Sequence, residues 1–323
     1  MSLLYGDDFV GKTDLAGDDY AFYNCKSLTK IEIPDGVTSI GFWSFACCSS
    51  LTSVTIPGDV GYIRDGMFYD CIKLTDVIVC DGVTSIGNRA FGNVHTAFTL
   101  PSSLRTIDSE AFADGGAGAL VIPNGVETIG GYCFGSSYFT SITIPSSVTS
   151  IGLQLMSYCG SLTTITCNAN IQELPISFAE YCQSLTSVTL PSTLTAFHMD
   201  GCQFIACDSL PSITIPASVT DIAANQVFAK CDALREIHFL GNMPNTYSSY
   251  VGEQKMPFGN YSAWMDDGDE EQRPCGAQYD EQTGQWTVSG TLYVPTSDST
   301  WDNVASDPAF ATLLDNGWSL VRE

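Results

Sequence analysis

Basic side chains are scarce in this 323-residue sequence. It has 12 Lys and Arg against 36 Asp and Glu, which gives a formal net charge of -24 at pH 7. Such a charge repels the phosphates of nucleic acids and the headgroups of anionic lipids. We therefore expect neither nucleic acid nor a membrane surface as a partner.

Long apolar runs and catalytic motifs are also missing. No stretch of about 18 apolar residues exists, so we expect no membrane-spanning helix. The opening residues, MSLLYGDDFVGKTDL, lack the basic and apolar regions of a signal peptide. Neither a GxSxG nucleophile motif nor a GxxxxGK[ST] phosphate-binding loop occurs. The sequence predicts a protein that is not an enzyme and needs no cofactor.

Metal-binding patterns are absent as well. The three histidines, His95, His198 and His238, form no HExxH motif, and none of the 13 cysteines lies in a CxxC pair. The acidic run at residues 266–271 does not match the EF-hand spacing. We interpret it as a solvated loop, with Ca²⁺ binding as the alternative.

One eleven-residue phrase recurs along the chain. ITIPSSVTSIG at 142–152 has close copies in IEIPDGVTSIG at 31–41 and VIVCDGVTSIG at 77–87, and a fainter one in ITIPASVTDIA at 213–223. The aligned prolines are Pro34, Pro57, Pro101, Pro123, Pro145, Pro191 and Pro216, with Cys80 and Asn168 in the two vacant slots. The steps of 21 to 25 residues predict a solenoid built from stacked coils.

Each unit reads L-x-x-I-x-I-P-x-x-V-x-x-I-G-x-x-x-F-x-x-C. The alternation in I-x-I predicts a half-buried strand, and proline ends it because proline has no N–H to donate to a neighbouring strand. V-x-x-I then turns two apolar side chains inward on the far wall. A phenylalanine column should fill the interior, formed by Phe22, Phe45, Phe68, Phe91, Phe112, Phe134, Phe178, Phe204 and Phe228.

Coils near residues 92–119 are shortened. His95 and Ala117 there occupy the slot that usually holds the first leucine. We expect a local irregularity at this point.

Cysteines recur three residues after the phenylalanine slot, at Cys25, Cys48, Cys71, Cys159, Cys207 and Cys231, while Cys182 follows four residues after it. Small thiols at one slot per coil are typical of buried packing residues. Cysteines stacked in neighbouring coils would project in parallel, which fits the torsion of a disulfide poorly. We therefore expect reduced thiols.

These units, exemplified by CKSLTKIEIPDGVTSIGFWSFACC at 25–48, resemble the BspA-type leucine-rich repeats over about residues 18–240. FLGNMPN at 239–245 and GTLYVPTSDSTW at 290–301 are similar to that family's ending. The resemblance implies a β-rich, right-handed leucine-rich-repeat solenoid of about ten coils with little helix and a C-terminal cap carrying a short helix. It also implies a bacterial cell-surface or secreted protein that binds host or neighbouring-cell proteins without catalysis.

The period divides the chain into three regions. We assign 1–27 to an N-terminal cap and partial repeat, 28–240 to the repeats, and 241–323 to an irregular insertion and cap. In the last region, Asp307 and Pro308 predict a helix start, Gly317 a helix end, and Tyr279–Val288 a hairpin.

The outward positions of the strands are the candidate binding surface, because repeat proteins usually bind partners on an extended face. The candidates are Thr55, Asp76, Thr99, Thr143, Thr166, Thr189, Thr214, Glu236 and His238, with the aromatic residues Trp43, Tyr62 and Trp264 as anchors off the sheet. A protein partner is the first hypothesis. A glycan-binding module using the aromatic side chains, or a passive structural spacer, are the alternatives.

Overall fold

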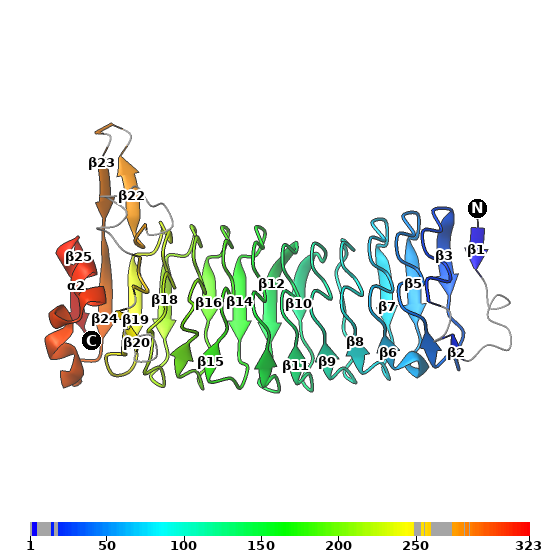
Figure 1. Cartoon of the computed structure of the whole chain (residues 1–323), viewed down its shortest axis with the longest axis horizontal. Coiled ribbons are helices and arrows are strands. Elements are labelled where there is room, and N and C mark those ends of the chain that lie inside the picture. The colour runs from blue at the N-terminus through cyan, green and yellow to red at the C-terminus, as the bar shows by residue number, and fades with distance from the viewer. Residues whose placement is uncertain are drawn as a thin grey trace. The chain divides into compact units, whose positions relative to one another are not determined.

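The computed structural model describes residues 2–4, 14–15, 19–248, 253–254, 256–259, 273–280, 282–283 and 285–323. Trp264 and the acidic run 266–271 lie outside the described residues. The chain forms two compact units, Met1–Cys159 and Gly160–Glu323. In each, successive coils lie side by side with their strands parallel (Figure 1). The described residues make a parallel β-solenoid of about nine turns with little helix, which confirms the predicted fold class.

The first wall of unit 1 has one strand in each coil, except in the coil that contains residues 97–100. Its strands are β1 (Ser2–Leu4), β3 (Leu28–Glu32), β5 (Ser53–Ile56), β7 (Asp76–Val79), β10 (Gly118–Val121) and β12 (Phe139–Ile144). Like residues face each other across the coils, since Val54 of β5 lies opposite Val77 of β7. Strand β5 ends directly before Pro57 and β12 directly before Pro145, as the proline slot predicts.

The V-x-x-I segments form a second wall of two-residue strands. They are β2 (Asp14–Leu15), β4 (Ser39–Ile40), β6 (Tyr62–Ile63), β8 (Ser85–Ile86), β9 (Thr106–Ile107), β11 (Thr128–Ile129) and β13 (Ser150–Ile151), and a short 3₁₀ turn, η2 (Gly58–Val60), precedes β6. Strands β6, β8, β9, β11 and β13 form one continuous parallel sheet. The second wall therefore continues through the region of shortened coils.

The phenylalanines stack as the spacing predicts. The rings of Phe45 and Phe68 are 5.6 Å apart with an interplanar angle of 10°, and Phe68 and Phe91 are 5.6 Å apart at 8°. All three side chains are fully buried. Burial of each such side chain contributes roughly 1.5–3 kcal/mol, so this column is a major part of the interior.

The predicted irregularity lies at residues 97–100. Strand β7 is the last strand of one sheet and β10 the first strand of another, and within the fully described stretch 19–248 no strand pairs with the segment between them. Phe98 occupies the slot that holds Val77 in the preceding coil and Leu120 in the following one. Its ring packs between Phe91 and Phe112, at 5.1 and 4.8 Å. A phenyl ring needs more space inside the coil than the side chain of valine or leucine. The main chain of residues 97–100 therefore lies out of hydrogen-bonding register with β7 and β10.

Unit 2 repeats the plan with larger variation. Its first-wall strands are β14 (Thr164–Cys167), β16 (Ser187–Thr189), β18 (Ser212–Ile215), β19 (Glu236–Phe239), β24 (Gly290–Val294) and β25 (Trp318–Arg322), and its second wall contains β15 (Glu173–Leu174) and β17 (Ala196–Phe197). Phe204 stacks on Phe228 at 5.8 Å and 4°, whereas Phe178 meets Phe204 edge-on at 71°. The phenylalanine column is thus regular in one part of this unit and tilted in another.

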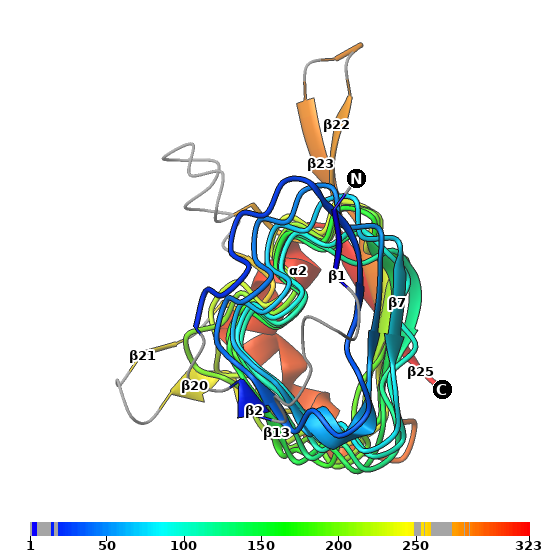
Figure 2. The same ribbon diagram turned by 90° about the vertical axis from the view of Figure 1, so that its right-hand side faces the viewer.

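The final coil keeps the interior slots although its turns are enlarged. Phe258 stacks on Phe228, with ring centroids 6.2 Å apart. Cys275 is fully buried and occupies the next cysteine slot after Cys231. Two antiparallel hairpins leave this coil: β20 (Tyr247–Ser248) with β21 (Glu253–Gln254), and β22 (Ala277–Asp280) with β23 (Gln285–Val288). Both project from the coil outline (Figure 2). The second is the hairpin that the sequence predicts.

The predicted C-terminal helix closes the last coil of unit 2. A 3₁₀ segment, η4 (Ser299–Ser306), leads into α2 (Pro308–Asp315), and the Asp307 carboxylate accepts hydrogen bonds from the N–H groups of Ala309 and Phe310. The Phe310 ring packs 5.8 Å from Phe239 and 5.2 Å from Phe258. The cap therefore covers apolar coil interior that would otherwise face water.

Candidate binding face

The outward sheet face is defined as the side chains of the first-wall strands that point away from the coil interior. In unit 1, one row across β3, β5 and β7 consists of Lys30, Ser53 and Asp76, which are register neighbours. The adjacent row consists of Glu32, Thr55 and Ile78. Alternation along each strand places these residues outside because their neighbours in sequence fill the core.

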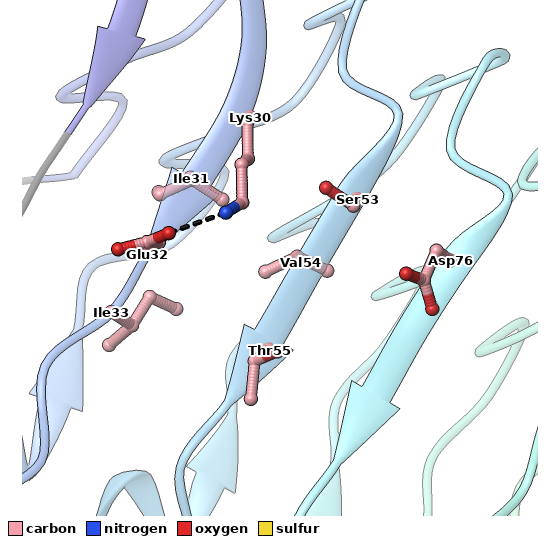
Figure 3. Close-up of a pocket in the computed structure, with 8 residues that line it drawn as sticks. All are labelled: Lys30, Ile31, Glu32, Ile33, Ser53, Val54, Thr55 and Asp76. Carbon is pink, nitrogen blue, oxygen red and sulfur yellow. Dashed lines mark hydrogen bonds and ion pairs between the residues drawn. The ribbon is translucent and has the colours of Figure 1, made fainter.

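A hollow of about 400 Å³ lies on this face, lined by Lys30, Ile31, Glu32, Ile33, Ser53, Val54, Thr55 and Asp76 (Figure 3). The Lys30 ammonium donates to the Glu32 carboxylate at 2.5 Å. Both side chains are about half exposed, so this ion pair contributes little to stability. The lining of the hollow thus includes charges of both signs.

The predicted threonine positions all lie on the outward sheet face. Their exposure differs within each unit: Thr55, Thr99, Thr189 and Thr214 are exposed, whereas Thr143 and Thr166 are half-buried. Asp76 is exposed beside Thr55 and lines the same hollow. Their role in binding stays a prediction.

The predicted pair Glu236 and His238 has partners within unit 2. His238 Nδ1 lies 3.1 Å from Glu323 Oε1, and its Nε2 lies 3.4 Å from Glu236 Oε2. The imidazole also stacks on the Tyr293 ring, with centroids 4.3 Å apart. These contacts tie β19 to β24 and to the residue after β25, so the group has a local structural role.

Of the predicted aromatic residues, Trp43 lies in a turn, whereas Tyr62 lies in strand β6 of the second wall, and both have local contacts. The Trp43 indole covers Gly66, where an added Cβ would lie 2.3 Å from the ring, and it meets Tyr69 edge-on at 5.3 Å. The Tyr62 hydroxyl donates to Asp65 at 2.7 Å. Burial, together with this hydrogen bond, raises the pKa of Tyr62.

Among the described residues of unit 1, two aromatic pairs near the surface are not coplanar. Tyr20 and Tyr23 are both exposed, but their rings meet at 77°, and Trp43 meets Tyr69 at 62°. A glycan-binding platform would present rings in one plane. These two pairs therefore give no support to the glycan alternative.

Two exposed apolar side chains on the outward sheet face are absent from the set chosen from sequence. Ile78 on β7 is 50% exposed and Val121 on β10 is 65% exposed. They flank the sheet break at 97–100, beside a second hollow of about 410 Å³ lined by Phe98, Thr99, Leu100, Ser102, Ala119, Val121 and Pro123. The available signal was the contrast with six other coils, which have threonine at the position of Ile78 and Val121.

The cysteines form hydrogen bonds rather than a reactive centre. A thiol of one coil donates to a main-chain carbonyl of the preceding coil, as in Cys48 to Phe22 at 3.2 Å, Cys71 to Phe45 at 3.2 Å, Cys159 to Phe134 at 2.9 Å, Cys207 to Ala179 at 3.2 Å and Cys231 to Phe204 at 3.0 Å. We call this set the thiol ladder. Burial raises the pKa of Cys48 to about 11 and that of Cys207 well above its ordinary value. Such thiols are poor nucleophiles at neutral pH.

A solenoid of short coils, each with one parallel first-wall strand and a shared interior of leucine, isoleucine and phenylalanine, is a leucine-rich-repeat protein. The family model described as "BspA type Leucine rich repeat region" matches in six copies over residues 18–117, 117–235 and 198–251. The chain belongs to the BspA-type leucine-rich-repeat family, as its motifs indicate.

Several solved structures are similar to this chain. A leucine-rich cell surface protein from Faecalibacterium prausnitzii is 31% identical, over 72% of this chain and 79% of that one, with a TM-score of 0.39. A leucine-rich repeat protein from Bacteroides ovatus is 18% identical, over 94% and 86%, with a TM-score of 0.44. The pneumococcal vaccine antigen PcpA is 16% identical, over 92% and 79%, with a TM-score of 0.43. A search of curated proteins finds no match.

In the part of the chain that the structure describes, no helix combines the length and the apolar character needed to cross a membrane.

Proposed function

We propose that this chain is a non-enzymatic binding module of a bacterial surface or secreted protein, and that it recognises a protein partner through its outward sheet face. The observation that carries this proposal is the exposure of Ile78 and Val121, at 50% and 65%. Isolated exposed apolar residues are ordinary on protein surfaces. These two lie on one face, at the slot that holds threonine in six other coils, and Val121 lines the second hollow.

The chemistry of the surrounding face suits a protein partner. Protein interfaces combine an apolar centre with a polar rim. Here Ile78 and Val121 supply the apolar part, and Lys30, Glu32 and Asp76 supply charges of both signs. The similar cell surface protein of Faecalibacterium supports display outside a cell. The side chains of Ile78 and Val121 are not needed to hold the coils together, because both point away from the interior.

Site-specific photo-crosslinking tests the proposal. A benzophenone side chain would replace Thr55 or Thr143 on the outward sheet face, and Thr84 or Thr149 as matched threonines beside the second wall. Each variant would be irradiated with solubilised surface proteins of host cells and of neighbouring bacteria. We expect protein adducts at the two sheet positions and none at the two controls.

Equal labelling at all four positions, or none at any of them, would contradict recognition through the sheet face. A passive spacer would produce one of those two results. A glycan array probed with the same chain distinguishes the remaining alternative, since binding there without protein adducts would favour a glycan partner.

A further inference from the structure

Two asparagines of the chain directly precede a glycine, in Asn124-Gly125 and Asn316-Gly317. The main-chain nitrogen of the residue after an asparagine can attack the carbon of the side-chain amide, and glycine hinders this attack least because it has no side chain. The two pairs have different surroundings. Asn124 is exposed in the turn after Pro123, and its carboxamide forms no hydrogen bond with the residues that the structure describes.

The second pair is held in place at the end of α2. Asn316 Nδ2 donates to the Thr312 carbonyl at 2.7 Å, and Gly317 N–H donates to the Leu314 carbonyl at 3.4 Å. An added Cβ at Gly317 would lie 2.4 Å from the Val288 carbonyl oxygen, so the main chain of β23 packs directly against this glycine. Both the attacking nitrogen and the amide under attack are therefore restrained in this pair.

A positive charge lies against the first pair. An added Cβ at Gly125 would lie 2.6 Å from Arg105 Nη1. That nitrogen donates to the carbonyls of Ser102 and Leu104, at 3.2 and 2.9 Å, which fix its position. Attack by Gly125 requires loss of its N–H proton, and a nearby cation favours the resulting anion. Arg105 thus promotes formation of the nucleophile.

Another coil shows which contacts an aspartate makes in this turn. Asp81-Gly82 occupies the slot of Asn124-Gly125, in the turn after Cys80. Asp81 Oδ1 accepts hydrogen bonds from the N–H and the hydroxyl of Ser102 in the next coil, both at 3.0 Å. An aspartate at this slot therefore joins two coils.

The turn at Asn124 has the same arrangement of neighbours. Gly82 N–H donates to Ser103 Oγ at 2.9 Å, and Gly125 N–H donates to Ser147 Oγ at 3.0 Å. Ser146, the residue before Ser147, is exposed and corresponds to the serine that bonds to the aspartate in the other coil. An aspartate in place of the asparagine would thus meet the N–H and the hydroxyl of Ser146.

We propose that Asn124 is a site of spontaneous deamidation, at which the chain converts its own asparagine into aspartate with water as the only co-reactant. The Gly125 nitrogen loses its proton to solvent and bonds to Asn124 Cγ, while the side-chain nitrogen takes up a proton and leaves as ammonia. Water then opens the five-membered imide. Cleavage of its bond at Cγ gives aspartate, and cleavage at the main-chain carbonyl gives isoaspartate. Either product adds a negative charge next to Pro123, which lines the second hollow.

Peptide mapping by mass spectrometry tests this site. The native full chain is incubated in H₂¹⁸O at mildly alkaline pH, because the water that opens the imide labels each product with heavy oxygen. We expect Asn124 to react at least about tenfold faster than Asn316, since two hydrogen bonds must break before the second pair reacts. In guanidinium chloride, which removes both environments, the two rates should agree within about threefold.

A substitution at Arg105 tests the electrostatic part of the proposal. Arg105→Gln should slow the reaction at Asn124 in the native chain by about two- to fivefold, the effect of one exposed charge. Arg89→Gln is the matched control, because Arg89 pairs with Glu110 in another turn, and it should leave the rate unchanged. The rate at Asn316 reports on folding, since an unfolded variant would lose its protection there.

The contact of the product with Ser146 has its own test. Asn124→Asp should raise the urea midpoint of the chain, and Ser146→Ala should reduce that gain by removing the hydroxyl donor. Equal native rates at the two asparagines, or a rate at Asn124 that Arg105→Gln leaves unchanged, would overturn the deamidation site and its mechanism. A midpoint that Asn124→Asp does not raise would overturn the contact with Ser146.

Discussion

The thiol ladder should stabilise the stack of coils, and Cys71→Ala is the sharpest perturbation of it. The Cys71 thiol is fully buried and donates to the Phe45 carbonyl at 3.2 Å. That carbonyl also accepts the Cys48 N–H at 3.3 Å, so the substitution removes one of its two bonds. Loss of a weak hydrogen bond costs about 0.5–1 kcal/mol. Loss of the buried sulfur adds about 1 kcal/mol, as for one methylene.

We therefore expect Cys71→Ala to lower the free energy of unfolding by about 1.5–2 kcal/mol. Urea unfolding followed by circular dichroism, under reducing conditions, measures it. The matched control is Cys80→Ala, because Cys80 is only half-buried in the proline slot and should lose less than about 0.5 kcal/mol. Cys159→Ala removes a shorter bond, 2.9 Å to Phe134, and should reproduce the larger loss. Equal losses in Cys71→Ala and Cys80→Ala would refute the reasoning.

Three further outcomes are expected. Titration of the native chain with a thiol reagent should detect at most four of the 13 cysteines, and nearly all after unfolding without reductant; the accessible ones are Cys25, Cys47, Cys80 and Cys202. Because burial raises the pKa of the Cys48 thiol from 9.0 to about 11, the unfolded chain ionises first as pH rises. The contribution of the buried Cys48 thiol to the free energy of unfolding is therefore fully present below about pH 9 and should decline toward pH 11. An unchanged urea midpoint over this window would contradict a raised pKa of Cys48. Gly116 and Gly118 both have positive φ, at 77° and 63°, but only at Gly116 would a Cβ meet the Phe139 ring, at 2.4 Å. Thermal unfolding should show a loss of about 1 kcal/mol for Gly118→Ala and about 3 for Gly116→Ala, and similar losses would argue against this contact.

The interior of the coils was predictable because it depends on spacing alone. Proline after I-x-I ends a strand in any coil, and a phenylalanine at constant spacing must meet its counterpart in the next coil. Phe45 and Phe68 accordingly stack. Phe98, which interrupts the first wall, was visible only as a shortened coil, since its effect depends on Phe91 and Phe112 on either side.

The turns around the phenylalanine column were not predictable from local preference. Trp43 and Cys47 have left-handed φ values of 56° and 60°, a conformation that favours glycine. Hydrogen bonds between coils compensate: Trp43 N–H donates to Asp65 at 3.0 Å and Cys47 N–H to Tyr69 at 2.7 Å. Such bonds join residues more than 20 positions apart, so no short window of sequence reveals them.

The candidate face was predictable in outline. Alternation along the strands placed Thr55 and Asp76 outside, but the hollow beside them depends on Ser53 being smaller than its neighbours on adjacent coils. The aromatic residue Trp43 illustrates the opposite case. Its partner, Gly66, lies in the next coil and provides the space that the indole fills.

The final coil shows that the fold requires the interior slots but tolerates different lengths of sequence between them. Phe258 and Cys275 fill interior positions equivalent to those of Phe228 and Cys231, yet 16 residues lie between the first pair and only two between the second. Extra sequence between two interior slots adds little loop-closure entropy. The segments between interior slots can thus differ in length from coil to coil, whereas folding requires a small set of apolar residues at fixed slots.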